Sequence, residues 1–139
     1  QVAAVAPVSA VPIKEDLETC APSRPIAVLH FHGTADDANP YDGGFTQAGY
    51  EFVSVRDPMA FWTAQNDCPA QPVTEETGSI RHEIHSPCAE GSAVELYTII
   101  GGKHAWPGGE AVSQKMGEPT REISASRIMW EFFAAHPMP

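Results

Sequence analysis

Two apolar runs dominate the pattern of hydrophobic and polar positions along the chain. Residues 26–31 are almost continuously apolar, and residues 93–100 form the strongest run of all. Such runs, bounded by turn residues, are typical of parallel strands covered on both faces. Residues 2–8, rich in Ala and Val, predict a further buried strand. Residues 80–86 alternate only weakly and indicate an edge strand.

Two other segments have a helical pattern. Asp57-Pro58 indicates an N-cap followed by Pro at the first helical position, and the short helix that follows ends near Asn66. The final helix starts near Ile123. Its apolar residues recur at helical spacing: Ala125, Ile128, Met129, Phe132 and Phe133. Residues 12–25 and 106–119 are expected to be loops, the first with room for a helical turn. Strands alternating with helices predict an α/β layer structure.

Length and charge narrow the class of protein. The 139 residues fit a single domain, and a net charge of -10 argues against nucleic-acid binding and against docking on anionic membranes. No apolar run approaches the roughly 20 residues of a membrane helix. The chain starts without Met or a basic segment, so we expect a fragment, a processed product or a trimmed chain rather than a signal peptide.

The three cysteines lack metal-site spacing. Cys68 and Cys88 flank a segment rich in Pro and Thr, which a disulfide between them could close, and such a bond would imply an oxidising compartment. Cys20 would then be a free thiol or the partner of a cysteine outside this chain. Three unpaired thiols remain the alternative.

Two polar side chains follow the two strongest strands. Asp36 comes after residues 26–31 and a short turn, and His104 comes after residues 93–100 and two glycines. Sites in parallel sheets form at the carboxyl ends of strands, so both groups are expected at one edge. An imidazole that acts as a general base needs an acceptor for its other N–H, and a carboxylate serves. Asp37 is the competing acid, and a role as a turn residue is the alternative for either aspartate.

The surroundings of these two residues resemble the polyhydroxybutyrate depolymerase and feruloyl esterase family of secreted α/β-hydrolases. Residues 32–36 (His-Gly-Thr-Ala-Asp) and 40–44 (Pro-Tyr-Asp-Gly-Gly) resemble its acid loop. Residues 101–109 (Gly-Gly-Lys-His-Ala-Trp-Pro-Gly-Gly) are similar to its Gly-Gly-Gly-His-Thr-Trp-Pro-Gly loop. The final helix and the helix ending at Asn66 also match. The resemblance covers nearly the whole chain.

By this resemblance, Asp36 is the acid and His104 the base of a Ser-Asp-His triad, and Cys68 and Cys88 form a disulfide. Tyr41 and Trp106 are candidates to line the substrate site, with packing as their alternative role. The sequence departs from the family at three places: Lys103 replaces Gly, Ala105 replaces Thr, and residues 37–39 replace Pro-x-Val. Lys103 places a cation beside the base or points into solvent.

The nucleophile of such a triad is missing. Before Asp36 the chain has only Ser9 and Ser23, and neither lies in the Gly-x-Ser-x-Gly turn that an α/β-hydrolase uses. Residues 1–139 are therefore expected to be one partial α/β-hydrolase domain, with few parallel strands and a final helix packed on the sheet. A second chain would supply the nucleophile-bearing half, or the exposed edge at residues 2–8 would pair two copies. No cofactor is implied.

The resemblance implies that the chain is part of a secreted or periplasmic carboxyl-ester hydrolase. We expect the chain alone to be inactive. Two other classes remain open. The first is a non-catalytic binding domain that kept the hydrolase scaffold. The second is a zinc protein, because five residues carry suitable ligand atoms. These are His30, His32, Asp36, His82 and His85.

Overall fold

The computed structural model describes residues 2–45 and 49–138 and is built on one five-stranded sheet. The strand order is β1 (Ala4–Val5), β2 (Ala27–Gly33), β7 (Val94–Ile99), β6 (Ile80–His85) and β5 (Val73–Thr77). β1, β2 and β7 run parallel, whereas β6 and β5 are antiparallel to their neighbours. The sheet is therefore mixed.

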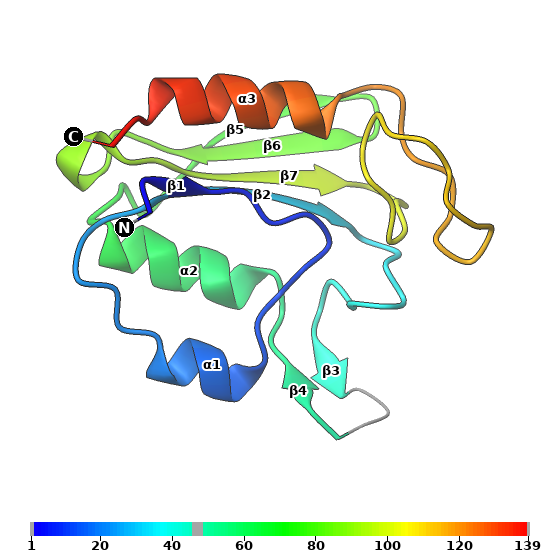
Figure 1. The fold of residues 1–139 in the computed structure, drawn as a ribbon, viewed down its shortest axis with the longest axis horizontal. Helices are drawn as coiled ribbons and strands as arrows, with labels where there is room; N and C mark the ends of the chain where they lie inside the picture. Colours follow the sequence, from blue (N-terminus) through cyan, green and yellow to red (C-terminus); the bar gives the residue numbers. More distant parts are fainter. Residues whose placement is uncertain (1, 46–48, 139) are drawn as a thin grey trace.

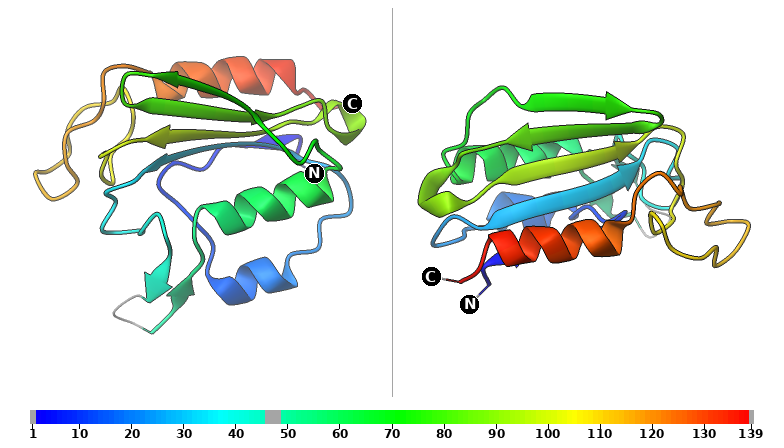
Figure 2. Two further views of the ribbon diagram at one scale, coloured as in Figure 1. Left: turned by 180° about the vertical axis from the view of Figure 1, so that it is seen from behind. Right: turned by 90° about the horizontal axis from the view of Figure 1, so that it is seen from above.

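Helices cover both faces of this sheet (Figure 1). α3 (Ala125–Ala135) lies on one face, and α2 (Arg56–Gln65) and α1 (Lys14–Thr19) lie on the other. Because side chains alternate along a strand, β2 feeds two separate cores. Leu29 and Phe31 pack with Met129 of α3, while Val28 packs with Met59 of α2. Figure 2 shows α3 running along β2 when the molecule is seen from above.

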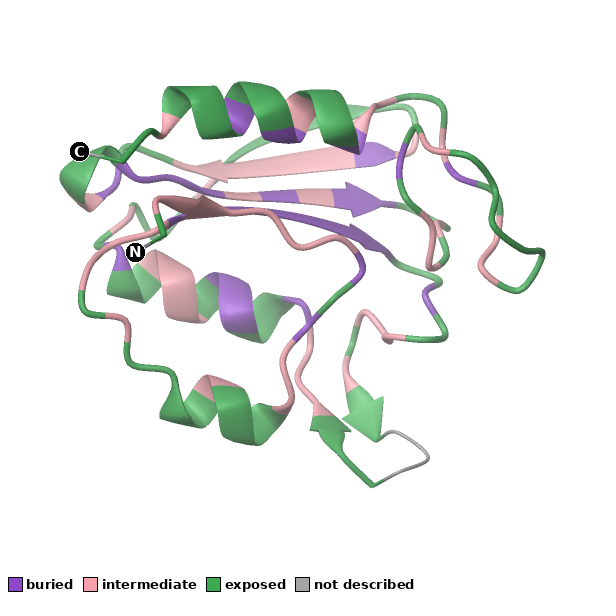
Figure 3. Ribbon diagram, viewed as in Figure 1, coloured by how far each residue is buried: buried purple, intermediate pink, exposed green. Residues whose placement is uncertain are grey.

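The two strongest apolar runs form the strands predicted for them. Every residue of β2 is buried, as the continuous colour of that strand in Figure 3 shows, and β7 lies beside it. α3 also forms where predicted, with Ser124 as its N-cap. Its buried residues are Ala125, Met129 and Phe132, whereas Phe133, also expected on the core face, is 39% exposed. Its position at the edge of the apolar stripe accounts for this difference.

The prediction of an edge strand at residues 80–86 is wrong. β6 lies between β7 and β5, and the edge is β5, within the segment expected to be an irregular excursion. All five residues of β5 are exposed, so its sequence (Val-Thr-Glu-Glu-Thr) has no apolar alternation to reveal it. A short antiparallel pair, β3 (Gly44–Phe45) with β4 (Glu51–Phe52), was likewise not predicted.

The start of α2 also differs from the prediction. Val55 occupies the N-cap position, and Asp57 lies inside the first turn. The Asp57 carboxylate accepts hydrogen bonds from the backbone N–H and hydroxyl of Ser54, at 2.8 and 2.7 Å. An acidic side chain reaching back from the first turn stabilises a helix start as a capping residue would.

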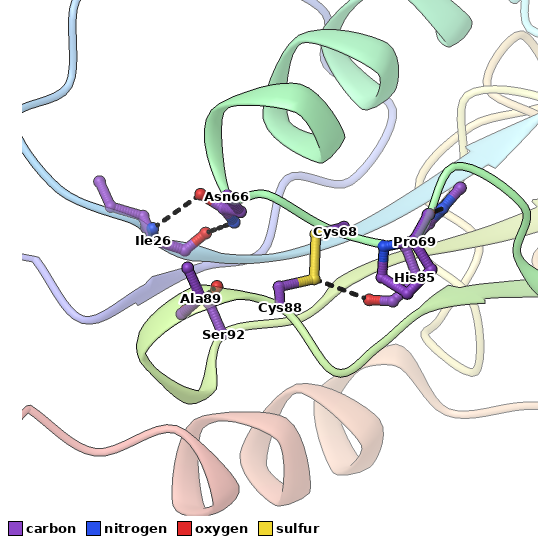
Figure 4. Close-up of a disulfide and its surroundings, with 8 residues drawn as sticks. All are labelled: Ile26, Asn66, Cys68, Pro69, His85, Cys88, Ala89 and Ser92. Atoms are coloured by element: carbon purple, nitrogen blue, oxygen red, sulfur yellow. Dashed lines mark hydrogen bonds between the residues drawn. A yellow bond between two sulfur atoms is a disulfide. The ribbon is translucent and has the colours of Figure 1, made fainter.

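A disulfide joins Cys68 and Cys88 beyond the end of α2 (Figure 4). It links this helix end to the 3-10 helix η1 (Ala89–Gly91), so the β5–β6 hairpin is closed at its base. Next to it, the buried Asn66 side chain bonds both the N–H and the C=O of Ile26, at 3.2 and 2.7 Å. Cys20 is an exposed free thiol. No helix in the described ranges is long and apolar enough to cross a membrane.

Candidate active site

Two loops meet at the carboxyl ends of β2 and β7, on the right of Figure 1. Gly33 lies so close to Gly102 that a Cβ atom on Gly33 would sit 2.2 Å from the Gly102 carbonyl oxygen. Hydrogen bonds join the loops at this contact: Thr34 N–H donates to Ile99 C=O, and Ala35 N–H donates to Gly102 C=O, at 3.0 and 2.9 Å. Only glycine permits this approach, so the turns are built for contact.

The contact brings Asp36 and His104 together from 68 positions apart. His104 Nδ1 lies 2.9 Å from Asp36 Oδ2, and the Asp36 side chain is completely buried while that of His104 is 27% exposed. A carboxylate only accepts hydrogen bonds, so Nδ1 of His104 carries the proton. In the neutral ring Nε2 then holds the basic lone pair, which is the state a general base requires.

The loop after Asp36 holds this carboxylate in place. Oδ1 accepts hydrogen bonds from the backbone N–H groups of Ala38 and Asn39, at 2.9 and 2.8 Å. These bonds leave Oδ2 directed at His104. Asp37, the competing acid, is exposed to solvent. Of the two aspartates, Asp36 is the one paired with the imidazole.

Behind Asp36 lie two further imidazoles of β2, both fully buried. His32 Nε2 lies 2.8 Å from the carbonyl oxygen of Asn39 and 3.5 Å from Asp36 Oδ2. His30 Nε2 lies 3.0 Å from His32 Nδ1. Burial lowers the pKa of His30 to about 3, with the neighbouring His32 adding to the effect. Burial also lowers the pKa of His32, against the opposing effects of its bond to Asn39 and of the Asp36 charge.

The two candidate aromatic residues differ in placement. The Tyr41 hydroxyl lies 3.1 Å from Thr98 Oγ1, and its ring meets His32 edge-on, so Tyr41 packs beneath the acid loop. Trp106 is 45% exposed and donates from Nε1 to Ser126 Oγ of α3. Lys103 is exposed, with its aliphatic part beside Gly117. Trp106, two positions after His104 in the chain, is therefore the more exposed of the two candidates.

No serine, threonine or cysteine among the described residues hydrogen-bonds to His104. Ser9 is buried just beyond β1, where its backbone N–H donates to the Phe31 carbonyl oxygen, at 2.8 Å. Ser23 lies exposed in the loop before β2. The described part of the chain thus presents a paired carboxylate and imidazole, with no hydroxyl or thiol hydrogen-bonded to the imidazole.

The five candidate zinc ligands do not form one cluster, because His82 and His85 lie apart from His30, His32 and Asp36. His82 bonds Glu95 at 2.8 Å on the α3 face of the sheet, and His85 bonds the Pro69 carbonyl oxygen at 2.7 Å. His30 and His32 lie on β2, on the opposite face from His82. Across residues 2–45 and 49–138, no three His, Cys, Asp or Glu side chains are arranged to hold a metal ion.

No family model matches the chain. It is similar to feruloyl esterase B of Piromyces equi, with 33% identity over 90 residues. The aligned part covers 62% of this chain and 17% of that protein, so the chain spans a small fraction of the length of its relative. The similarity supports a distant relationship to an esterase. The relationship to polyhydroxybutyrate depolymerases stays a prediction.

One feature of the site was missed in the sequence, and it lies in the loop that follows Asp36. The contact of His32 with the loop after Asp36 was not predicted, because the sequence singled out His32 only as a candidate zinc ligand and as part of the motif at residues 32–36. The signal was present: residues 32–36 (His-Gly-Thr-Ala-Asp) stand at the end of an almost continuously apolar run. Only the folded loop shows that Asn39 returns to meet the imidazole.

Proposed function

We propose that this chain is the part of a secreted carboxyl-ester hydrolase that carries the acid and the base of a Ser-Asp-His triad, within an α/β-hydrolase fold. The observation that carries the proposal is the hydrogen bond from His104 Nδ1–H to the buried Asp36 carboxylate, at 2.9 Å. Its solvent-facing imidazole is in the tautomer that a general base needs. The similarity to feruloyl esterase B points to esters as the substrate class.

In the proposed reaction His104 Nε2 takes the proton of a serine hydroxyl as the serine oxygen attacks the ester carbonyl. The same proton then passes to the leaving alcohol, and a second cycle with water releases the acid. Asp36 stays ionised and stabilises the imidazolium formed at each step. The serine and the oxyanion donors come from outside residues 1–139, and Trp106 lines the approach to His104.

The nucleophile-bearing half would dock at the edge of the sheet along β1, which among the described residues pairs only with β2 on its inner side. Next to β1 lies an apolar groove of about 450 Å³, between β2 and the two helices of that face. Its lining includes Val5, Val11, Leu17 and Trp62. An unpaired strand edge beside an apolar groove favours contact with another polypeptide. We assign this contact to the missing half, and pairing of two copies is the competing outcome.

The disulfide supports a location outside the reducing cytosol. A bond between Cys68 and Cys88 persists in oxidising compartments and is rare in the cytosol. A secreted or periplasmic enzyme fits this bond.

Hydrolysis of methyl ferulate and p-nitrophenyl acetate tests the proposal. The chain alone is expected to be inactive and not labelled by a fluorophosphonate, which reacts with activated serines. Assembled with a polypeptide that carries a Gly-x-Ser-x-Gly turn, it should become active, with the label on that polypeptide. Asp36→Asn should then lower kcat by about 10⁴-fold, because it disturbs the tautomer of the base. Asp37→Asn is the matched control and should change kcat little.

Two results would overturn the proposal. Full activity of Asp36→Asn or His104→Ala would remove these residues from the reaction. Inertness of the assembled protein toward all esters tested would favour a non-catalytic binding domain on the same scaffold.

A further inference from the structure

We propose that His32 is a positioning residue that holds the Asp36 carboxylate toward His104, and that His30 sets the ring of His32 for this task. The inference rests on the triad proposed above. It concerns two buried imidazoles that the proposed reaction does not itself use. Both lie on β2, on the same face, with His30 six residues and His32 four residues before Asp36.

The hydrogen-bond partners determine which nitrogen of each ring carries a proton. The Asn39 carbonyl oxygen can only accept, so Nε2 of His32 is the donor in that 2.8 Å bond. In a neutral ring, Nδ1 of His32 is then an acceptor. His30 therefore donates to it from its own Nε2, at 3.0 Å. One backbone carbonyl thus orders two imidazoles in sequence.

This order fixes the acid loop from behind. His32 Nε2–H donates to the backbone carbonyl of Asn39, and the backbone N–H of Asn39 donates to Asp36 Oδ1. The same imidazole N–H also faces Asp36 Oδ2 at 3.5 Å. The loop cannot move away from β2 without breaking the bond to His32. Oδ2 is therefore held where His104 Nδ1 meets it.

The neutral state of both rings matters for the pair in front. A protonated His32 would place a second cation beside Asp36 and compete with His104 for its charge. Burial disfavours that cation, since His32 and His30 are 0% and 2% exposed. The titratable residues around His32 are Asp36, His104, His30 and Tyr41, whose ring meets His32 edge-on. Because His32 and His30 stay neutral, the charge of Asp36 stabilises His104 alone.

The position of His32 is itself rigid. Its backbone lies within the β2–β7 ladder, where it is paired with Thr98, and the next residue is the close-packed Gly33. The Tyr41 ring lies edge-on to it, with its centroid 5.9 Å from that of His32. A ring held on these sides can act as a fixed donor. This is the property required of a group that positions another.

The test compares His32→Gln with His32→Leu. The Gln amide nitrogen can reach the place of His Nε2 and donate to Asn39, whereas Leu fills similar space without a donor. In the 139-residue chain, proton NMR of the His104 Nδ1–H reports its bond to Asp36. We expect His32→Leu to speed exchange of this proton about 10-fold or more and to shift its resonance, and His32→Gln to restore both.

Activity of the assembled enzyme gives an independent readout. We expect His32→Leu to lower kcat by about 10- to 100-fold with little change in KM, as for other residues that orient a catalytic group. His82→Leu is the matched control, because it removes another imidazole–carboxylate pair, with Glu95, on the opposite face of the sheet. It should leave the His104 resonance unchanged.

An unchanged His104 Nδ1–H in folded His32→Leu would overturn the inference, as would a failure of Gln to restore it. If His32→Leu does not fold, His30→Leu serves instead, since it removes the donor that orders His32. The His32 ring then loses the donor at Nδ1 that helps to hold it, so the His104 proton should exchange faster; an unchanged His104 signal would again overturn it. Should Asp36→Asn prove fully active while His32 still controls the His104 signal, the proposed function fails and the coupling stands.

Discussion

At the scale of single residues, the site depends on groups that tolerate little change. Gly33 is one, because the Gly102 backbone occupies the space of a side chain there. His30 is another, because it is a buried base that must stay uncharged in the folded protein. The first controls the distance between two loops, and the second controls the charge beneath one of them. Each leads to a measurable consequence.

Replacing Gly33 by Ala should separate the two loops. The added Cβ would meet the Gly102 carbonyl at 2.2 Å, and backbone atoms on both sides must shift to relieve the contact. We expect a loss of about 3 kcal/mol in the free energy of unfolding, measured by urea denaturation, and loss of the protected His104 Nδ1–H. Gly109→Ala, whose nearest contact would be 3.1 Å, should cost clearly less. Equal effects would contradict this account.

The buried His30 predicts a dependence of stability on pH. The pKa of His30 is about 3 in the folded state against 6.5 for a free histidine. Between these two pH values the unfolded chain binds a proton at His30 that the folded chain does not bind. Stability is unaffected by His30 above pH 6.5. It falls by up to about 1.4 kcal/mol for each pH unit below that value, until the pH approaches 3.

The check is the free energy of unfolding of wild-type protein and His30→Gln at pH 7, 6 and 5. The variant keeps a donor for His32 but cannot take up a proton. The free energy of unfolding of the variant should decline less steeply with falling pH, by up to about 1.4 kcal/mol for each pH unit. Parallel curves for the two proteins would show that His30 is already protonated or accessible when folded.

At the scale of elements, the disulfide and the glycine contact secure opposite ends of the sheet. Cys68 and Cys88 close the β5–β6 hairpin against the end of α2, away from the carboxyl ends of β2 and β7. The disulfide therefore stabilises the scaffold without touching the candidate site. The exposed β5 depends on it most, because it contributes no buried residue to either core.

Cys68→Ser with Cys88→Ser should lower the free energy of unfolding by about 3 kcal/mol, since the bond restricts a segment of 20 residues in the unfolded chain. The His104 Nδ1–H signal should persist at 25 °C. Cys20→Ser is the control for thiol removal and should leave stability unchanged, because Cys20 is exposed and unbridged. A similar loss in both proteins would refute a specific role for the disulfide.

At the scale of the whole molecule, one side of the sheet is complete and the other is open. β5 ends it with charged and polar residues, which discourage pairing, whereas β1 is short and lies beside the apolar groove. The proposed function assigns that side to the nucleophile-bearing half. Association through the groove should be driven by apolar contact rather than by charge, since the residues that line the groove are mostly apolar.

Light scattering and sedimentation should therefore show that the chain associates, with the nucleophile-bearing polypeptide or with itself. Leu17→Glu should abolish this association, because it places a charge in the groove on a helix that has no buried residue to lose. Glu18→Gln, on the same helix, is the control. A stable monomer that ignores added partner would contradict the assignment of this side as an interface.

The amino-acid sequence by itself determined β2, β7 and α3, and marked Asp36 and His104 as side chains at strand ends. Continuous apolar runs and helical spacing report burial directly, so those elements could be predicted. The tertiary structure alone decided that β6 is interior, that β5 exists, and that His32 stands behind Asp36. These features depend on which neighbour fills each face and which carbonyl meets each ring. Such pairings join distant positions, and local patterns do not encode them.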